Sequence, residues 1–255
     1  MKSVWNFLNT RMEAIQVLLS KPKNVVTPQT FQKIAQEIEK LDAFMGLLKD
    51  GNDKFKRKKT FKPFKKLARL VDGVSSLQQE EMMLNQLFSK EQLIEYKRDV
   101  RKLKESKRED YFLVVDAKFV ENLKSIKSDL EPFLRQTGKK NVSEYCKRKK
   151  KKISKILGKT ELKRSKMDEL SERVREYKTI RTLTEKATTK KDEFDLLLDS
   201  WKTNHTQISY LLILKESRVF AAKEAGLIKQ AENKLNNQEA DFISRIIDGI
   251  SKSGF

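Results

Sequence analysis

Four dense clusters of lysine and arginine are the residues of this sequence best suited to binding a ligand. They are Lys54–Lys66 with Arg69, Lys97–Lys104, Lys147–Lys155 and Lys163–Arg181. Phosphate groups are recognised by cationic donors in number, with lysine supplying a mobile point charge and arginine a rigid fork. Lysine dominates here. This favours a flexible, repetitive anion over base-specific readout, which depends on Arg, Asn and Gln at base edges.

Residues that could perform catalysis are scarce. His205 is the only histidine, so a His-rich metal site or a paired-histidine proton relay cannot form. Cys146 has no evident base partner, and we interpret it as an incidental thiol. Carboxylates at helical spacing, such as Glu37 with Asp42, are expected to pair with neighbouring lysines. No glycine-rich phosphate loop is present. We therefore predict a protein that is not an enzyme and has no metal or cofactor.

The net charge points to the class of partner. The 255 residues include 56 Lys and Arg against 36 Asp and Glu, which gives +20. Such an excess repels itself in a compact state, so it indicates a polyanion partner or, alternatively, a general device for solubility. No apolar run approaches the ~20 residues of a membrane span, and no secretion signal is recognisable. With a single cysteine, this predicts a cytoplasmic protein.

The elements that position these clusters are predicted to be helices. Apolar residues recur at helical spacing along nearly the whole chain, while Gly and Pro number only 8 and 4, which disfavours a β fold. Thr27 before Pro28 is a strong helix start, and Ser89 with Gln92 forms a capping-box pattern that should open another helix. We expect nine or ten helices. Because short loops join them, neighbours should pack antiparallel as bundles.

Some helix boundaries follow from caps and breakers. Asp116 is expected to cap a helix that stops near Pro132, and Gly73 to interrupt an earlier helix. The last two helices are predicted at residues 219–235 and 238–250. Because the pattern restarts around Asp116, we predict an all-α fold of two packed helical bundles, residues 1–115 and 116–255.

Three segments share an order of basic, aliphatic and aromatic residues with a known family. They are Gln32–Leu48, Lys62–Leu67 and Asp199–Leu212. In this order the chain resembles the CHAD domain (conserved histidine α-helical domain) over most of its length. The resemblance implies two similar helical bundles that form one domain, with basic residues lining a central cavity that binds inorganic polyphosphate.

The chain also departs from that family. The two histidine positions are occupied by Gln32 and Asp199, and the first motif has Ala35 in place of Arg. The resemblance therefore implies a divergent member whose polyphosphate site is either weakened or rebuilt on other basic residues. The clusters and the resemblance together predict these polyanion-binding residues: Lys33, Lys40, Lys58, Lys62, Lys65, Lys66, Arg69, Arg98, Arg101 and Lys202.

Two alternative functions stay open from the sequence. An anionic-membrane binder would need an uncovered apolar helix face opposite the lysines. A nucleic-acid binder would stack bases on the aromatic residues among the basic ones, although the core-like spacing of these residues predicts that they pack inward. These residues are Phe55, Phe61, Phe64, Tyr96 and Tyr145. An interaction scaffold of coiled-coil type is the other alternative, and the short loops and absence of sustained heptads argue against it.

Overall fold

The computed structural model describes residues 2–157, 164–184, 193–217, 220 and 222–250, and these residues form an all-α structure without strands. The predicted fold class is therefore confirmed, with ten α-helices in the described ranges. They are α1 (Lys2–Leu19), α2 (Pro28–Gly51), α3 (Arg57–Thr60), α4 (Lys62–Leu87), α5 (Ile94–Val114), α6 (Ala117–Gln136), α7 (Lys139–Leu157), α8 (Arg164–Arg181), α9 (Glu193–Ser217) and α10 (Ala222–Ile250). Lys163, the first residue of the fourth basic cluster, lies outside the described residues.

The helices divide between two compact units, and α4, α5, α7 and α8 contribute to both. Unit 1 comprises Met1–Gln79, Asp99–Lys149 and Glu176–Lys186, and unit 2 comprises Glu80–Arg98, Lys150–Arg175 and Ala187–Phe255. Each unit thus takes residues from both sides of position 116. The division into bundles 1–115 and 116–255 stays a prediction. Within the described ranges, every helix is too short or too polar to cross a membrane.

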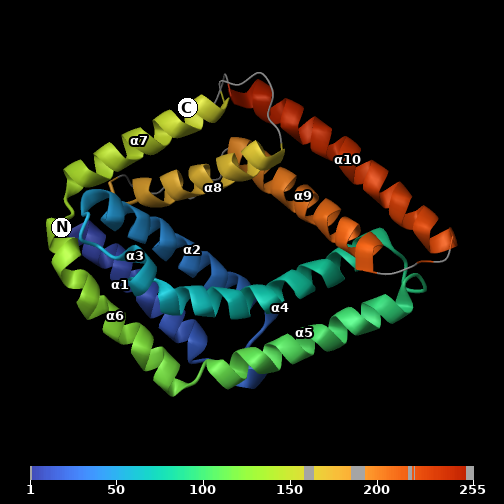
Figure 1. The fold of residues 1–255 in the computed structure, drawn as a ribbon, viewed down its shortest axis with the longest axis horizontal. Coiled ribbons are helices and arrows are strands. Elements are labelled where there is room, and N and C mark those ends of the chain that lie inside the picture. The colour runs from blue at the N-terminus through green and yellow to red at the C-terminus, as the bar shows by residue number, and fades with distance from the viewer. Residues whose placement is uncertain (1, 158–163, 185–192, 218–219, 221, 251–255) are drawn as a thin grey trace. The chain divides into compact units, whose positions relative to one another are not determined.

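Unit 1 is built around α1 and α2, which pack against each other, with α6 against both (Figure 1). Its core contains Leu8, Phe44 and Phe64, each completely buried. The ring of Phe31 on α2 meets that of Tyr111 on α5 edge-on, with the centroids 4.9 Å apart. Apolar stripes on five or more helices therefore close one core, as amphipathic helices require.

Two helix starts lie where the sequence places them. At the start of α2, the Thr27 N–H donates to Thr30 Oγ1 at 3.2 Å and a reciprocal bond completes a capping box. At the start of α6, the Asp116 carboxylate accepts from the Phe119 N–H at 2.7 Å. These caps satisfy backbone donors that the first helical turn leaves without partners.

Two predicted breaks are wrong. Helix α4 continues through Gly73, because Val71 and Val74 on either side are buried and their packing outweighs the ~1 kcal/mol preference against glycine. Helix α6 continues through Pro132 to the buried Leu134. Pro132 itself is exposed, so the carbonyl that loses its helical partner there can be hydrated.

Unit 2 is dominated by α9 and α10, which run antiparallel and in close contact (Figure 1). Trp201 on α9 is completely buried, and the Asn204 side chain donates to the carbonyl of Leu235 on α10 at 2.8 Å. The predicted gap between residues 235 and 238 is wrong, because Leu235 and Ile246 are buried along one continuous α10.

The helix predicted to open at Ser89 begins instead at Ile94. The Ser89 N–H does donate to Gln92 Oε1 at 2.8 Å, so half of the expected capping box forms, but it closes a turn that precedes the helix. Leu93 then takes a positive φ of 54°, a conformation that non-glycine residues rarely adopt.

Candidate functional site

The segment Lys54–Arg69 leads from α2 into α4 and belongs entirely to unit 1. It contains nine Lys and Arg residues and no Asp or Glu. Its three phenylalanines are turned inward, with exposed fractions of 2% for Phe55, 3% for Phe61 and 0% for Phe64. Phe55 packs on Phe133 of α6 with the ring centroids 5.0 Å apart. The buried rings thus anchor the segment.

Five of the predicted site residues form what we call the basic stripe: Lys58, Lys62, Lys65, Lys66 and Arg69. All five are exposed. The four on α4 follow the i, i+3, i+4, i+7 spacing that places side chains on one side of a helix. From Lys62 to Arg69 the helix rises about 10 Å. The four stripe residues on α4 therefore form a compact, linear array of cations.

Little negative charge compensates the stripe. Arg57, just before it, donates to Asp42 Oδ1 at 2.6 Å and is paired. The Lys66 ammonium lies 5.9 Å from the centroid of the Phe119 ring, a cation–π contact. The other four members of the stripe form no ion pair with any residue that the structure describes. Their charge is directed to solvent.

The remaining predicted site residues lie on other elements, and none has a contact that links it to the stripe among the described interactions. Lys40 is paired within α2, since its ammonium donates to Glu37 Oε1 at 2.7 Å. Arg11 pairs with the same carboxylate at 2.9 Å. Lys33 on α2 is exposed. The other three are exposed and lie on α5 and α9: Arg98, Arg101 and Lys202.

The second cluster includes a buried lysine that binds backbone carbonyls of the protein itself. Lys97 is only 5% exposed, and its ammonium donates to the carbonyls of Phe88 at 3.1 Å and Ser89 at 2.6 Å. These carbonyls directly follow the end of α4. A cation there complements the negative end of the helix dipole, so Lys97 stabilises the turn between α4 and α5.

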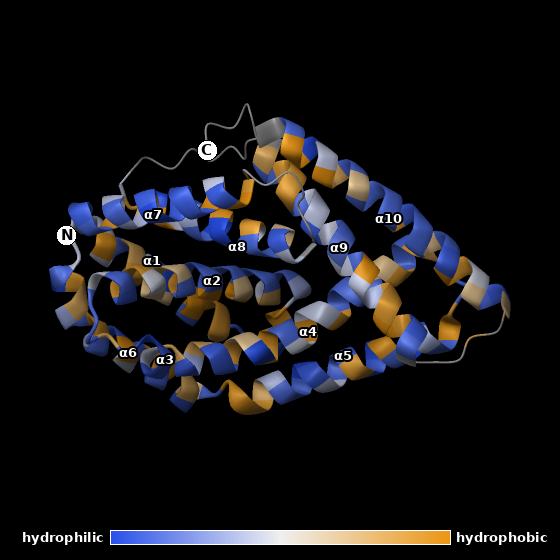
Figure 2. Ribbon diagram, turned by 45° about the horizontal axis from the view of Figure 1, so that its top comes forward, coloured by the Kyte–Doolittle hydropathy of each residue, from blue (hydrophilic) through white to orange (hydrophobic). Residues whose placement is uncertain are grey.

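The third cluster lies on α7, whose ribbon is predominantly hydrophilic (Figure 2). Part of its charge is paired within unit 1. Lys149 donates to Glu176 Oε2 at 2.5 Å, and Arg148 pairs with Asp50. The Tyr145 hydroxyl donates to the other Glu176 oxygen, and burial raises the pKa of this hydroxyl. Glu176 therefore ties α8 to two residues of α7.

The fourth cluster lies on α8, which also contains four carboxylates among its basic residues. Lys166 donates to Glu169 Oε2 at 2.7 Å, and Arg173 donates to Glu169 Oε1 at 2.9 Å. The hydrogen bonds from Lys166 and then from Arg173 hold the pKa of the Glu169 carboxyl below its ordinary value. These cations are partnered along their own helix.

The single histidine is part of the packing in unit 2. His205 stacks on Trp201 with the ring centroids 5.1 Å apart. Its Nδ1 lies 3.0 Å from Glu239 Oε1, and its Nε2 lies 3.8 Å from Asp168 Oδ2. In the described part of the chain, no group of three His, Cys, Asp or Glu residues is placed to hold a metal ion.

Comparison with known proteins assigns no family or function to this chain. No protein-family model, curated protein or solved structure matches this chain. The resemblance to the CHAD domain stays a prediction, and so does the polyanion partner.

Sequence reasoning missed a group of polar residues that the fold brings together in unit 1. Ser75 and Gln78 on α4 meet Lys104 and Arg108 on α5 around a pocket. Gln32 at the start of α2 also lines it. Only Lys104 fell within a predicted cluster. Single serines and glutamines on separate helices carry no signature in the sequence.

Proposed function

We propose that this chain is a non-enzymatic polyanion-binding protein whose basic stripe holds inorganic polyphosphate. One observation carries the proposal: Lys54–Arg69 has nine cations and no carboxylate, and the stripe side chains are exposed. A linear array of cations suits a linear, repetitive anion. Binding would release the counterions condensed on the polyanion, so affinity should fall steeply as salt rises.

The burial of the phenylalanines favours polyphosphate over single-stranded nucleic acid. Stacking of bases on exposed aromatic rings supplies much of the affinity of proteins that bind single strands. Phe55, Phe61 and Phe64 are at most 3% exposed and offer no face for a base. Polyphosphate has only charged groups to be recognised. It is also the ligand implied by the resemblance to the CHAD domain.

The proposal includes no chemistry on the anion. The stripe consists of ammonium and guanidinium groups, with no carboxylate, imidazole or thiol to serve as a general base or nucleophile. Lysine and arginine hold phosphate oxygens by charge-assisted hydrogen bonds. The protein would therefore retain or sequester the chain of phosphates.

The test is a competition titration at ~0.15 M salt, an ionic strength at which only close charge contacts persist. Long-chain polyphosphate would be compared with duplex DNA, single-stranded RNA and anionic vesicles at matched charge. The decisive variant is Lys62→Glu/Lys65→Glu/Arg69→Glu. Its matched control is Lys223→Glu/Lys229→Glu/Lys234→Glu on α10, which changes exposed lysines and lowers the net charge equally.

We expect preferential binding of polyphosphate that is lost in the α4 variant and kept in the α10 control. Equal losses in both variants would overturn the stripe as the site, because net charge alone would then explain binding. Equal and weak binding of every polyanion would overturn the choice of polyphosphate. A preference for RNA would favour a nucleic-acid binder instead.

A further inference from the structure

Six residues follow one side of the continuous helix α5 with a symmetric spacing. They are separated by 4, 4, 3, 4 and 4 positions, and the series begins and ends with an apolar residue. We call them the α5 face: Ile94, Arg98, Lys102, Glu105, Glu109 and Leu113. All six are exposed. At 3.6 residues per turn these positions stay within an arc of about 100°, so they form one stripe along the helix.

The apolar residues at the two ends of the α5 face are open to solvent. Ile94 is 58% exposed and Leu113 is 80% exposed, the highest fraction among the large apolar residues that the structure describes. Covering them with another surface would be favourable, because apolar area in contact with water costs free energy. Both ends of the face would therefore gain from a partner lying along α5.

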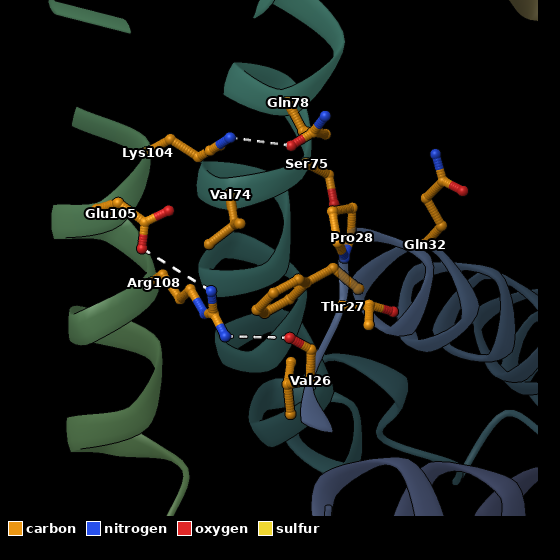
Figure 3. A pocket seen from close by; sticks show the side chains of 11 residues that line it. Val26, Thr27, Pro28, Gln32, Val74, Ser75, Gln78, Lys104, Glu105 and Arg108 are labelled. Carbon is orange, nitrogen blue, oxygen red and sulfur yellow. Dashed lines mark hydrogen bonds and ion pairs between the residues drawn. The ribbon is translucent and has the colours of Figure 1, made fainter. Parts of the chain in front are cut away.

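The inner side of α5 is already occupied within unit 1. Figure 3 shows Lys104 and Arg108 directed from α5 toward α4 and the start of α2. Lys104 donates to Gln78 Oε1 at 3.2 Å, and Arg108 donates to the Val26 carbonyl at 3.1 Å. Further along this side, Tyr111 is 2% exposed. The α5 face lies on a different side of the helix, where a partner can approach.

The charges of the α5 face change sign at its middle. The half nearer the N-terminus contains Arg98 and Lys102, and the other half contains Glu105 and Glu109. Arg98 and Lys102 form no ion pair with any residue that the structure describes. The face is therefore basic toward one end and acidic toward the other, with an apolar residue outside each charged pair.

The two carboxylates have partners within the chain, but these pairs are weak. Glu109 pairs with Lys23 at 2.5 Å while both side chains are 55% exposed, and Glu105 lies 3.8 Å from Arg108. Exposed ion pairs contribute at most about 1 kcal/mol. A carboxylate accepts several hydrogen bonds at once, so both groups can still bind a further cation.

We infer that the α5 face is the contact surface for a second copy of this chain, with the two α5 helices antiparallel about a twofold axis. Because the spacing is symmetric, Arg98 then faces Glu109 of the second copy, and Lys102 faces Glu105. Ile94 packs against Leu113, and the symmetry repeats every contact. A parallel arrangement would instead oppose like charges, so the charge order selects the antiparallel one.

The dimer is expected to be weak. Helix α5 has 21 residues and is therefore about 30 Å long, and one pair of such helices buries less than the ~1,200 Å² of a standard interface. The net charge of +20 on each copy also opposes association when it is not screened by salt. We expect a dissociation constant on the order of 10–100 µM at ~0.15 M salt.

The test is sedimentation velocity of the full chain from about 1 to 300 µM in ~0.15 M salt, a range chosen to bracket the expected dissociation constant. Arg98→Glu/Lys102→Glu makes the charges of the face wholly acidic, and Glu105→Lys/Glu109→Lys makes them wholly basic. Each variant alone should dimerise at least about tenfold more weakly than wild type, because like charges then meet. An equimolar mixture of the two should form a heterodimer at least as tight as the wild-type dimer.

The charge-matched control is Lys118→Glu/Lys124→Glu, which reverses two exposed lysines of α6 and should dimerise as wild type does. Circular dichroism of each variant checks that it is folded. A monomeric wild type at 300 µM would overturn the inference, and so would undiminished dimerisation of the separate variants. A mixture of folded variants that stays monomeric would equally refute it.

This inference does not rest on the proposed function. Arg98 is also among the residues predicted to bind a polyanion, so the sedimentation experiments contain none. The basic stripe is unchanged in every variant. Failure of dimerisation would therefore leave polyphosphate binding untouched, and failure of polyphosphate binding would leave the dimer untouched.

Discussion

The segment Lys54–Arg69 and helix α8 are both rich in cations but use them differently. The first contains nine basic residues and no acidic ones, and its basic stripe is exposed. Helix α8 contains six basic and four acidic residues, and Glu169 and Glu176 accept hydrogen bonds from lysine or arginine. Nearby carboxylates therefore decide whether a cation is paired within the fold or left exposed.

Neutralising the stripe should give the largest effect. We expect Lys62→Gln/Lys65→Gln/Arg69→Gln to weaken polyphosphate binding about 100-fold at ~0.15 M salt, and to reduce the slope of log K against log salt by about 2 to 3. Isothermal titration at several salt concentrations measures both. Lys166→Gln/Arg173→Gln/Lys178→Gln on α8 is the comparison, and a similar loss there would erase the distinction between the two regions.

Removing the Glu176 charge should affect stability more than binding. Glu176→Gln loses an acceptor for Lys149 while both side chains are largely buried, at 18% and 16% exposed. We expect the free energy of unfolding to fall by about 1–2 kcal/mol in urea titrations. Polyphosphate affinity should stay within about twofold of wild type. Increased affinity with unchanged stability would show that this carboxylate instead restrains a ligand-binding cation.

Releasing the α8 cations should have a smaller effect of the opposite sign. Glu169→Gln removes the charged partner of Lys166 and Arg173, so α8 becomes more like the stripe. We expect polyphosphate affinity to rise by about threefold at most, because one exposed charge is worth little in salt. A rise as large as the loss from the stripe variant would place the binding site on α8.

The smallest effect is a pH dependence of the α8 pairs. The folded-state pKa of Glu169 lies below its ordinary value of 4.5, so its pairing contributes stability above that pH and loses it as the pH falls further. The unfolding midpoint of wild type should therefore drop more than that of Glu169→Gln between pH 5 and the acid limit of folding. Calorimetry of both proteins would measure this, and parallel curves would contradict it.

Helix starts were predicted correctly where a capping residue bonds to the backbone of residues close to it in the sequence. Thr27 and Asp116 cap helices as expected, because a cap needs only neighbours in the chain. Gly73 and Pro132 fail as breakers, because buried residues on both sides hold the helix together. The helix preference against glycine, about 1 kcal/mol, is outweighed by burying one or two valines.

The candidate site was likewise predictable only where it depends on residues close together in the sequence. The stripe follows from helical spacing, and the inward packing of Phe55, Phe61 and Phe64 is confirmed. Lys97 belongs to a cluster predicted to bind a ligand, yet it is buried at the end of α4. Its partners are backbone carbonyls, which have no sequence signature.

By itself, the sequence determined that this chain is helical, strongly basic and equipped with an acid-free run of cations. These properties depend on composition and on spacings of three and four residues, because residues so spaced lie on the same face of a helix. The tertiary structure alone decided which cations are paired, because Arg57 meets Asp42 and Lys149 meets Glu176 across helices. It alone created the pocket around Ser75 and Arg108, since residues about thirty apart converge only when their helices pack.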